Sequence, residues 1–207
     1  WLERAARAHE SVLDQTLAAS NIVPLRLCTI YENDDSVRQM LARERGAFVQ
    51  ALDHLAGREE WSVKVLIDPG LLAEEARAYC DDARRLEPDI DDSGGGAAYM
   101  LRRRAERQVR EVGDTLAAQV ADQVHTRLEE LALDAVRRSP QNRDLSGHEG
   151  DMVLNAAYLV EADRVEELQR VAAGLQSEHR ALGTRVELTG PWPPYNFVPG
   201  GGTAAIA

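Results

Sequence analysis

Helical spacing of apolar residues recurs along the chain and predicts five helices. The predicted helices cover residues 2–19, 36–56, 71–86, 101–135 and 163–182. Asp163 and Glu166 have the spacing of a capping box at the start of the last one. The fourth helix is longer than a small domain is wide, at a rise of about 1.5 Å per residue. Unless it breaks at Gly113 and Asp114, part of it has to pack outside its own domain.

Four shorter stretches have the composition of strands. They cover residues 22–31, 61–67, 152–160 and 185–188. The first is apolar and β-branched, and the second alternates apolar with polar residues like a half-buried strand. A chain that mixes strands with long helices is typical of the α+β class.

A linker divides the chain. Residues 88–96, with the sequence PDIDDSGGG, are rich in proline, glycine and aspartate. We therefore expect two small domains and a tail. The expected division is an N-terminal α+β domain over 1–90, a linker over 91–96, a C-terminal α+β domain with the long helix over 97–190, and a proline-rich aromatic tail over 191–207.

The start of the tail belongs to the segment LTGPWPPYNF at residues 188–197. Its three prolines fix φ and remove backbone donors, which excludes a helix and a place in the centre of a sheet. The result is a stiff, polyproline-like ribbon with three large aromatic side chains. Two roles stay open: an intramolecular clip over the protein's own sheet, which we favour, and direct docking on a partner.

Four short motifs together resemble the gas vesicle GvpL/GvpF family. LTGPWPPYNF is similar to the C-terminal signature of that family. Three further stretches match in the same order: AHESVL at 8–13, VPLRLCTIY at 23–31 and GAAYMLRR at 96–103. The resemblance extends from Trp1 to about Val198. The motif residues that we single out are His9, Pro24, Arg26, Tyr99, Gly190, Pro191, Trp192, Pro193, Pro194 and Tyr195.

The resemblance implies both a fold and a function. The family fold has two α+β domains with ferredoxin-like character, and family members carry several dozen residues, including strands, before the position of Trp1. Because the chain begins at Trp1 rather than at methionine, we expect it to lack those N-terminal strands. The implied function is non-enzymatic. It is that of an accessory or minor structural protein that binds the hydrophobic shell protein, and other gas vesicle proteins, and assists assembly.

The expected docking surface lies in the first domain. If residues 23–31 form a strand, they offer a partner a free backbone edge or an apolar groove. The expected partner-binding residues are Val23, Leu25, Leu27, Ile30 and Tyr31. A different class of protein stays open: a ligand-binding or regulatory α+β module that oligomerises through the long helix.

Charge and composition limit the classes of partner that the protein is expected to bind. The net charge of −11 disfavours DNA, RNA and anionic lipid, because each is bound through positive charge. No apolar run approaches the ~20 residues that span a bilayer. Two cysteines are too few for a disulfide scaffold. These observations favour a cytoplasmic protein that works with other proteins, here at the gas vesicle.

Few residues of the chain have a pattern typical of catalysis or of metal, phosphate or cofactor binding. The five histidines have no metal-ligand spacing, and we interpret them as structural. The glycines at 94–96 favour a flexible linker over a phosphate-binding loop, because no strand precedes them. The arginines at 102–110 form either a solvated face paired with nearby acids or a contact for an acidic partner. We therefore predict no catalytic, cofactor-binding or metal-binding residues and expect the protein not to be an enzyme.

Overall fold

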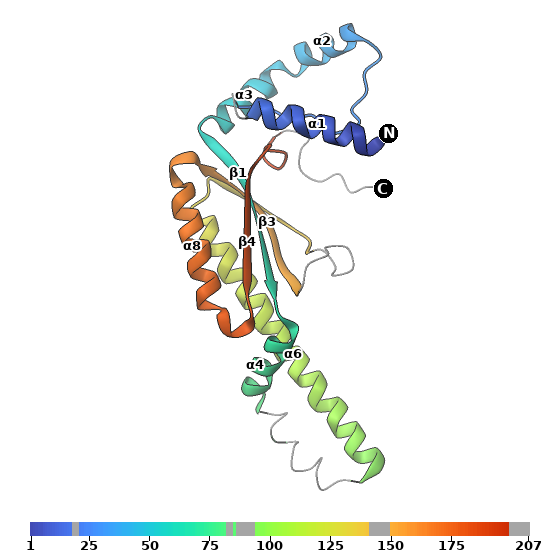
Figure 1. Ribbon diagram of the computed structural model, residues 1–207, viewed down its shortest axis with the longest axis vertical. Coiled ribbons are helices and arrows are strands. Elements are labelled where there is room, and N and C mark those ends of the chain that lie inside the picture. Colours follow the sequence, from blue (N-terminus) through green and yellow to red (C-terminus); the bar gives the residue numbers. More distant parts are fainter. Residues whose placement is uncertain (18–20, 82–84, 86–93, 141–149, 199–207) are drawn as a thin grey trace.

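The computed structural model describes residues 1–17, 21–81, 85, 94–140 and 150–198 (Figure 1). The described elements are α1 (Leu2–Leu17), α2 (Asp34–Arg43), α3 (Arg45–Leu55), β1 (Arg58–Ile67), α4 (Pro69–Tyr79), α6 (Gly95–Glu129), β2 (Asp134–Arg138), β3 (Asp151–Glu161), α8 (Val165–Glu178) and β4 (Arg185–Trp192). The short 3₁₀ turns η1 (Ala162–Arg164) and η2 (Arg180–Leu182) flank α8.

The four strands form one antiparallel sheet in the order β2-β3-β1-β4. β1 lies inside it: Val63 is opposite Ala156 of β3 on one side and Leu188 of β4 on the other. A strand from the first third of the chain is therefore held between two strands from the last third. Helices and one small antiparallel sheet confirm the α+β class, and the division into two domains stays a prediction.

Alternation along the strands builds the main core on one face of the sheet. The second half of α6 and α8 cover this face (Figure 1). Its buried strand residues include Trp61, Val63, Val65, Ile67, Leu154, Ala156, Tyr158 and Val160, and its helical residues include Val120, Val124, Leu128, Leu168 and Leu175. Every second strand residue points into this core, as expected for a sheet with one face buried under helices.

A hydrogen-bonded polar pair lies within that core. The Tyr158 hydroxyl is 2.8 Å from Nδ1 of His125 on α6. Burial raises the pKa of Tyr158 and lowers the pKa of His125, so both groups favour their neutral forms. This hydrogen bond gives His125 the structural role expected from the sequence. The buried Nε2 of His179, by contrast, has no hydrogen-bond partner among the described residues.

A second, smaller core lies on the opposite face of the sheet. Ala51 and Leu55 of α3 meet Ala157 and Leu159 of β3, and Phe197 and Val198 join them. Phe197 is only 9% exposed. The end of the aromatic segment is thus folded back over the protein's own sheet, which is the intramolecular clip favoured from the sequence.

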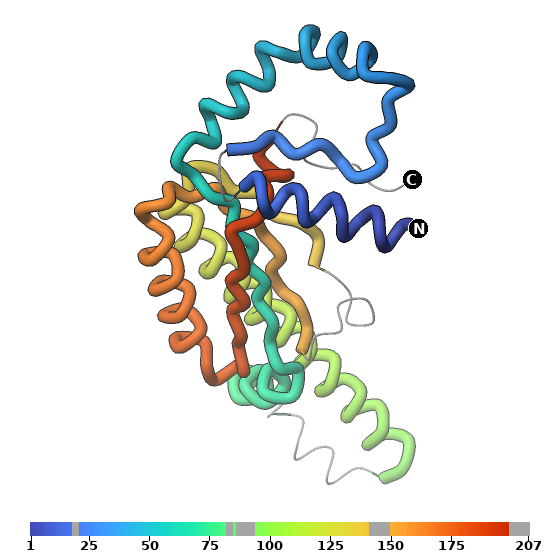
Figure 2. Tube along the Cα trace, turned by 45° about the horizontal axis from the view of Figure 1, so that its top comes forward, coloured from blue at the N-terminus to red at the C-terminus, as the bar shows by residue number. Residues whose placement is uncertain are grey.

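The two ends of the molecule differ in their helices. At one end, α1, α2 and α3 project beyond the sheet, and at the other α4 lies beside the first half of α6 (Figures 1 and 2). α6 does not break at Gly113, and its first half packs on α4 through Ala76, Cys80 and Val109. None of the described helices is long and apolar enough to cross a membrane.

The predicted strand over residues 22–31 is wrong. The segment is irregular: Pro24 has no amide to donate, Cys28 has a φ of 68°, and the Thr29 amide closes a turn. Ile22 and Pro24 are buried against the body of the protein, whereas Leu25, Leu27 and Ile30 are exposed, and none of these residues pairs in a sheet.

Other predicted boundaries also need correction. The helix over 36–56 is two helices that meet at Glu44. β2 was missed because apolar residues continue at helical steps past the end of α6. Asp163 lies within η1, and no side chain caps α8. Residues 91–93 of the expected linker over 91–96 lie outside the described residues, and Gly95 already begins α6.

Candidate functional site

Three of the four motif stretches meet at the end of the sheet from which α1 to α3 project. Nε2 of His9 on α1 lies 2.8 Å from the hydroxyl of Tyr195. The same hydroxyl donates to the backbone oxygen of Leu25 at 3.3 Å. Tyr195 thus joins a helix, a loop and the tail. We call the assembly of α1, residues 21–32 and residues 193–198 the motif site.

The Tyr195 hydroxyl has one proton and two hydrogen-bond partners. It donates to the oxygen of Leu25, and the direction of its 2.8 Å hydrogen bond with Nε2 of His9 depends on the tautomer of the imidazole. Burial raises the pKa of Tyr195, so the hydroxyl keeps its proton at neutral pH. The imidazole of His9 is therefore engaged in positioning α1.

A buried carboxylate holds the tail on the sheet. Glu60 of β1 is 3% exposed. It accepts the backbone amide of Asn196 at 3.1 Å and also the Asn196 side-chain amide. Arg138 of β2 donates to the side-chain oxygen of Asn196. Burial raises the pKa of Glu60, while the hydrogen bonds from Asn196 and the charge of Arg138 oppose that rise. Three polar side chains thus orient the tail.

β4 reaches the tail through a position that requires glycine. Gly190 has a φ of 154°. A Cβ there would lie 2.9 Å from the ring of Trp61 and 3.0 Å from the backbone oxygen of Glu60, which is too close for any side chain. Pro191 follows on an edge strand, where a missing amide donor costs no sheet pairing.

A cavity of about 390 Å³ lies between α1 and the tail. Its lining mixes apolar with polar side chains and includes Ala6, His9, Leu13, Asp14, Glu60, Arg138, Trp192, Pro193 and Tyr195. Within the described part of the chain, no group of three or more His, Cys, Asp or Glu residues is placed to hold a metal ion. His9, Glu60, Arg138 and Tyr195 bond to other groups of the protein. Their geometry holds segments in place.

The predicted partner-binding residues lie on an irregular loop rather than a strand edge. Leu25 and Leu27 are 41% and 39% exposed, and Ile30 is 86% exposed. Val23 and Tyr31 are half-buried, and Val23 contacts the smaller core. The loop presents separate apolar side chains and no free backbone ladder.

The remaining motif residues divide between the two ends of the molecule. Pro24, Pro193 and Pro194 are buried at the motif site, and Arg26 is exposed there. Tyr99 lies in the first turns of α6 and is 60% exposed. The GAAYMLRR stretch is therefore the one motif that does not join the motif site.

Sequence reasoning missed the polar residues that hold the tail. Glu60 lies one residue outside the predicted strand, and Asn196 lies inside the signature segment but was not singled out. An acidic residue beside a strand carries no sign that it will be buried. Its role is visible only from the register that places Glu60 opposite Trp192.

The chain is similar to gas vesicle proteins over nearly its full length. The family model of gas vesicle synthesis protein GvpL/GvpF matches residues 2–199. Gas vesicle protein L of Streptomyces sp. (strain CB03234) is 36% identical over 197 residues, covering 95% of this chain and 70% of that protein. Gas vesicle protein L1 of Halobacterium salinarum is 26% identical, covering 92% of this chain and 69% of that protein.

Two solved structures share the fold. The crystal structure of GvpF from Anabaena sp. PCC7120 has a TM-score of 0.73 at 22% identity, covering 94% of this chain and 77% of that chain. GvpF from Microcystis aeruginosa gives a TM-score of 0.67 at 18% identity over the same shares. These structural matches concern the fold alone. Together with the family match and the 36% identity to a gas vesicle protein L, they lead to one assignment: the chain belongs to the GvpL/GvpF family of gas vesicle synthesis proteins.

Proposed function

We propose that this protein is a non-enzymatic accessory protein of gas vesicle formation that binds the hydrophobic shell protein. Its docking surface comprises residues 21–32 together with the exposed faces of α1, α2 and α3. Its part in gas vesicle formation rests on its membership of a gas vesicle synthesis family. The proposal places the protein at the forming vesicle, with the shell protein and other gas vesicle proteins as its partners.

The distribution of exposed apolar side chains carries this proposal. Of the fifteen large apolar side chains exposed in the described part of the chain, nine lie within residues 1–52. These nine are Trp1, Leu2, Val12, Leu25, Leu27, Ile30, Leu41, Val49 and Leu52. Because apolar side chains gathered at the surface commonly mark an interaction site, their concentration supports docking at this end.

The thin packing of the same region supports the proposal. α1 has no buried residue, and Met40 is the buried residue of α2. Helices that bury so little on their own body keep apolar surface available to a partner. The hydrogen bonds of Tyr195 still fix α1 and the Leu25 loop relative to the sheet, so less ordering is needed on binding.

The negative net charge of the protein would keep its complexes with the shell protein dispersed. A shell subunit with exposed apolar surface tends to aggregate before assembly. A partner with a net charge of −11 covers part of that surface and adds electrostatic repulsion between complexes. The shell subunit then stays dispersed until it joins the wall of the vesicle.

Co-expression with the shell protein tests the proposal. We expect the shell protein to co-purify with the wild-type chain and to be more soluble than when expressed alone. The double substitution Leu25→Asp and Leu27→Asp should lower the recovered shell protein at least fivefold while circular dichroism and the melting temperature stay unchanged. Leu71→Asp is the matched control, since Leu71 is 41% exposed, like Leu25, but lies on α4.

Two results would contradict the proposal in different ways. A folded wild-type chain that binds no shell protein would remove direct shell binding altogether. Normal binding by the folded Leu25→Asp, Leu27→Asp variant would instead remove the loop from the docking surface.

A further inference from the structure

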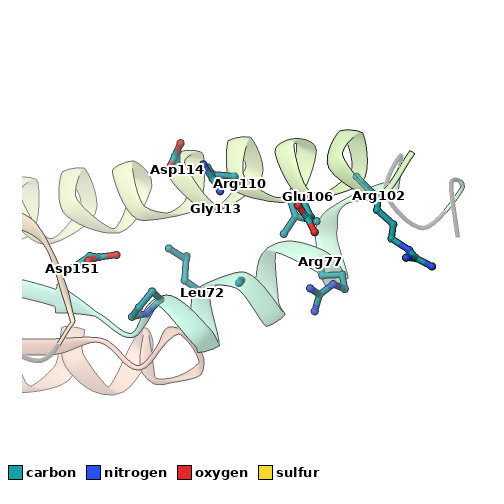
Figure 3. A pocket seen from close by; sticks show the side chains of 12 residues that line it. Leu72, Arg77, Arg102, Glu106, Arg110, Gly113, Asp114 and Asp151 are labelled. Carbon is teal, nitrogen blue, oxygen red and sulfur yellow. The ribbon is translucent and has the colours of Figure 1, made fainter. Parts of the chain in front are cut away.

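A groove of about 600 Å³ lies between α4 and the first half of α6, at the end of the molecule opposite the motif site (Figures 1 and 3). Apolar and small residues of both helices line it, among them Leu72, Ala73, Ala105, Val109 and Gly113. Short side chains let a neighbouring helix approach closely, so the groove has the shape of a helix-packing surface. It shares no lining residue with the cavity at the motif site.

The charged residues of α6 alternate in sign along this groove. Arg102, Glu106, Arg110 and Asp114 follow one another at intervals of four residues, and all four line the groove. Residues four positions apart are neighbours on a helix surface. The four therefore form a stripe about 18 Å long, at a rise of about 1.5 Å per residue. We call it the charge stripe, and its two positive and two negative charges cancel.

The remaining charged residues of the lining give the groove a basic end and an acidic end. Figure 3 shows Arg77 and Arg102 toward one end of the groove, and Asp114 and Asp151 toward the other. Three basic and three acidic side chains line the groove as a whole. A uniformly acidic or uniformly basic occupant would meet as many like charges as opposite ones. The lining therefore favours an occupant whose own charges alternate.

Most charges of the stripe have no partner within the chain. Arg102, Arg110 and Asp114 make no ion pair or side-chain hydrogen bond with any other described residue. Among the described residues, Glu106 pairs with Arg103 alone, at 4.0 Å, and these two side chains are 65% and 64% exposed. An exposed pair at that distance contributes little to stability. Because all four residues of the stripe are exposed, their charges are available to a partner.

A two-fold axis makes the charge stripe complementary to itself. Two copies of α6 can lie antiparallel with the axis midway between Glu106 and Arg110. Each Arg102 then faces Asp114 of the other copy, and each Glu106 faces Arg110 of the other copy. Four pairs of opposite charge form, and no like charges of the stripe face each other. The basic end of each groove also meets the acidic end of the other.

We propose that the protein forms a two-fold symmetric dimer in which the groove and the charge stripe pack against those of a second copy. α4 and the first half of α6 from each copy form a four-helix bundle, and the small residues of the groove lie at its centre. The arginines of this part of α6 pair with acids of the second copy. Tyr99, which is 60% exposed and lies just before the stripe, becomes partly covered.

This dimer leaves both motif sites accessible. α1, α2 and α3 lie at the end of the molecule away from the groove (Figure 1). An antiparallel dimer therefore presents two motif sites at its far ends, and one dimer can hold two shell subunits. That consequence rests on the proposed function, whereas the dimer itself does not.

Sedimentation equilibrium of the full chain tests the dimer in the absence of shell protein. We expect the mean mass to rise from that of one chain to that of two over about 1 to 500 µM. Arg102→Glu with Arg110→Glu makes the stripe wholly acidic, and Glu106→Arg with Asp114→Arg makes it wholly basic. Each double variant should raise the dissociation constant of the dimer at least tenfold. Circular dichroism should stay unchanged, because all four positions are exposed.

Mixing the two double variants distinguishes self-pairing from a general effect of charge. A wholly acidic and a wholly basic stripe are complementary in the same antiparallel register, so the mixture should form a heterodimer. The fourfold variant that combines all these substitutions reverses every charge of the stripe and keeps the net charge. It should dimerise like the wild-type chain. Arg127→Glu with Arg170→Glu, at exposed helical positions away from the groove, is the control and should leave the dimer intact.

Each alternative result overturns a definite part of the proposal. A wild-type chain that stays monomeric would leave the groove to a different protein. A dimer that persists in both double variants would place the interface elsewhere. A mixture without heterodimer, or a monomeric fourfold variant, would reject the antiparallel register. Shell binding is measured in a separate experiment, so failure of the dimer and failure of the proposed function are distinguishable.

Discussion

The two faces of the sheet are covered in different ways. On one face, every second side chain of β1 and β3 enters a continuous apolar core under α6 and α8. On the other face, Ala157 and Leu159 meet α3, the tail and the edge residues Val23 and Val136, and the tail is held by directional bonds to Glu60. Burial of apolar area stabilises the first face, whereas a few specific contacts position the second.

The difference between the two faces suggests that one stabilises the fold and the other positions the motif site. A large apolar core tolerates small movements, because its stabilisation is spread over many contacts. The tail face depends on a few polar atoms, so one lost bond displaces a motif that also fixes α1 and the Leu25 loop. We infer that the helix-covered face maintains the fold and that the tail face sets the geometry of the motif site.

Leu154→Ala should have the largest effect on stability. Leu154 is 1% exposed in the main core, and its loss leaves a cavity between strands and helices. We expect a loss of about 3 kcal/mol in the free energy of unfolding, measured by urea denaturation. Leu133→Ala, at a 50% exposed position, is the control and should cost little. A loss below about 1 kcal/mol for Leu154→Ala would contradict the role of this face.

Phe197→Ala sharpens the comparison between the faces. Phe197 covers Ala157 and Leu159, but its own cover is thinner than that of Leu154. We expect a loss of about 2 kcal/mol in the free energy of unfolding and faster amide exchange over residues 193–198. Tyr79→Ala removes a 65% exposed aromatic and should leave stability unchanged. A cost equal to that of Leu154→Ala would mean that the two faces stabilise the fold alike.

Glu60→Gln tests the buried carboxylate through its pH dependence. The folded-state pKa of Glu60 is raised above its ordinary value of 4.5, mainly by burial. A raised pKa gives stability that is fully present below pH 4.5 and is lost as pH rises through the folded pKa. The amide keeps one acceptor for Asn196 and loses the other, so we expect the variant to be about 1 kcal/mol less stable at pH 4.5. This deficit should shrink toward pH 7.

Denaturation curves from pH 4 to 8 measure that deficit. The control is Glu161→Gln, which removes an exposed carboxylate at the end of β3. A deficit for Glu60→Gln that grows with pH would show that burial does not govern the ionisation of Glu60.

Tyr195→Phe should have the smallest effect on global stability. It removes the bonds to His9 and Leu25 while the ring stays in place. We expect a loss of about 0.5 kcal/mol, together with severalfold faster amide exchange in α1. Tyr31→Phe removes a hydroxyl from the same region and serves as the control. Unchanged exchange in α1 after Tyr195→Phe would mean that the hydroxyl does not hold this helix.

Local sequence patterns predicted the helices better than the sheet. Apolar periodicity located α1, α6 and α8 to within several residues, because helical packing follows from neighbours three and four positions apart. The order of the strands depends on pairs such as Val63 with Ala156 and Leu188, which no local window contains. β-branched residues at 22–31 gave a false strand for the same reason: composition alone does not supply a pairing partner.

The candidate site was predictable only where motifs carried it. The aromatic segment and His9 were identified from the family-like stretches, and Phe197 does clip the sheet. Their meeting at the Tyr195 hydroxyl joins positions 170 and more residues apart. The burial of Glu60 and its hydrogen bond with Asn196 also depend on the tertiary fold, so no local sequence pattern predicts them.

The inner position of β1 has a consequence for synthesis on the ribosome. Residues 58–67 leave the ribosome well before β3 and β4 are translated. Both edges of β1 therefore have no pairing strand at that stage. Its Val63, Val65 and Ile67 are therefore apolar surface on a nascent chain that has no sheet to join. Every contact that closes this sheet spans many residues, which predicts slow folding for a protein of this size. A protein proposed to shield an apolar shell subunit must itself protect an apolar strand until its last third has been made.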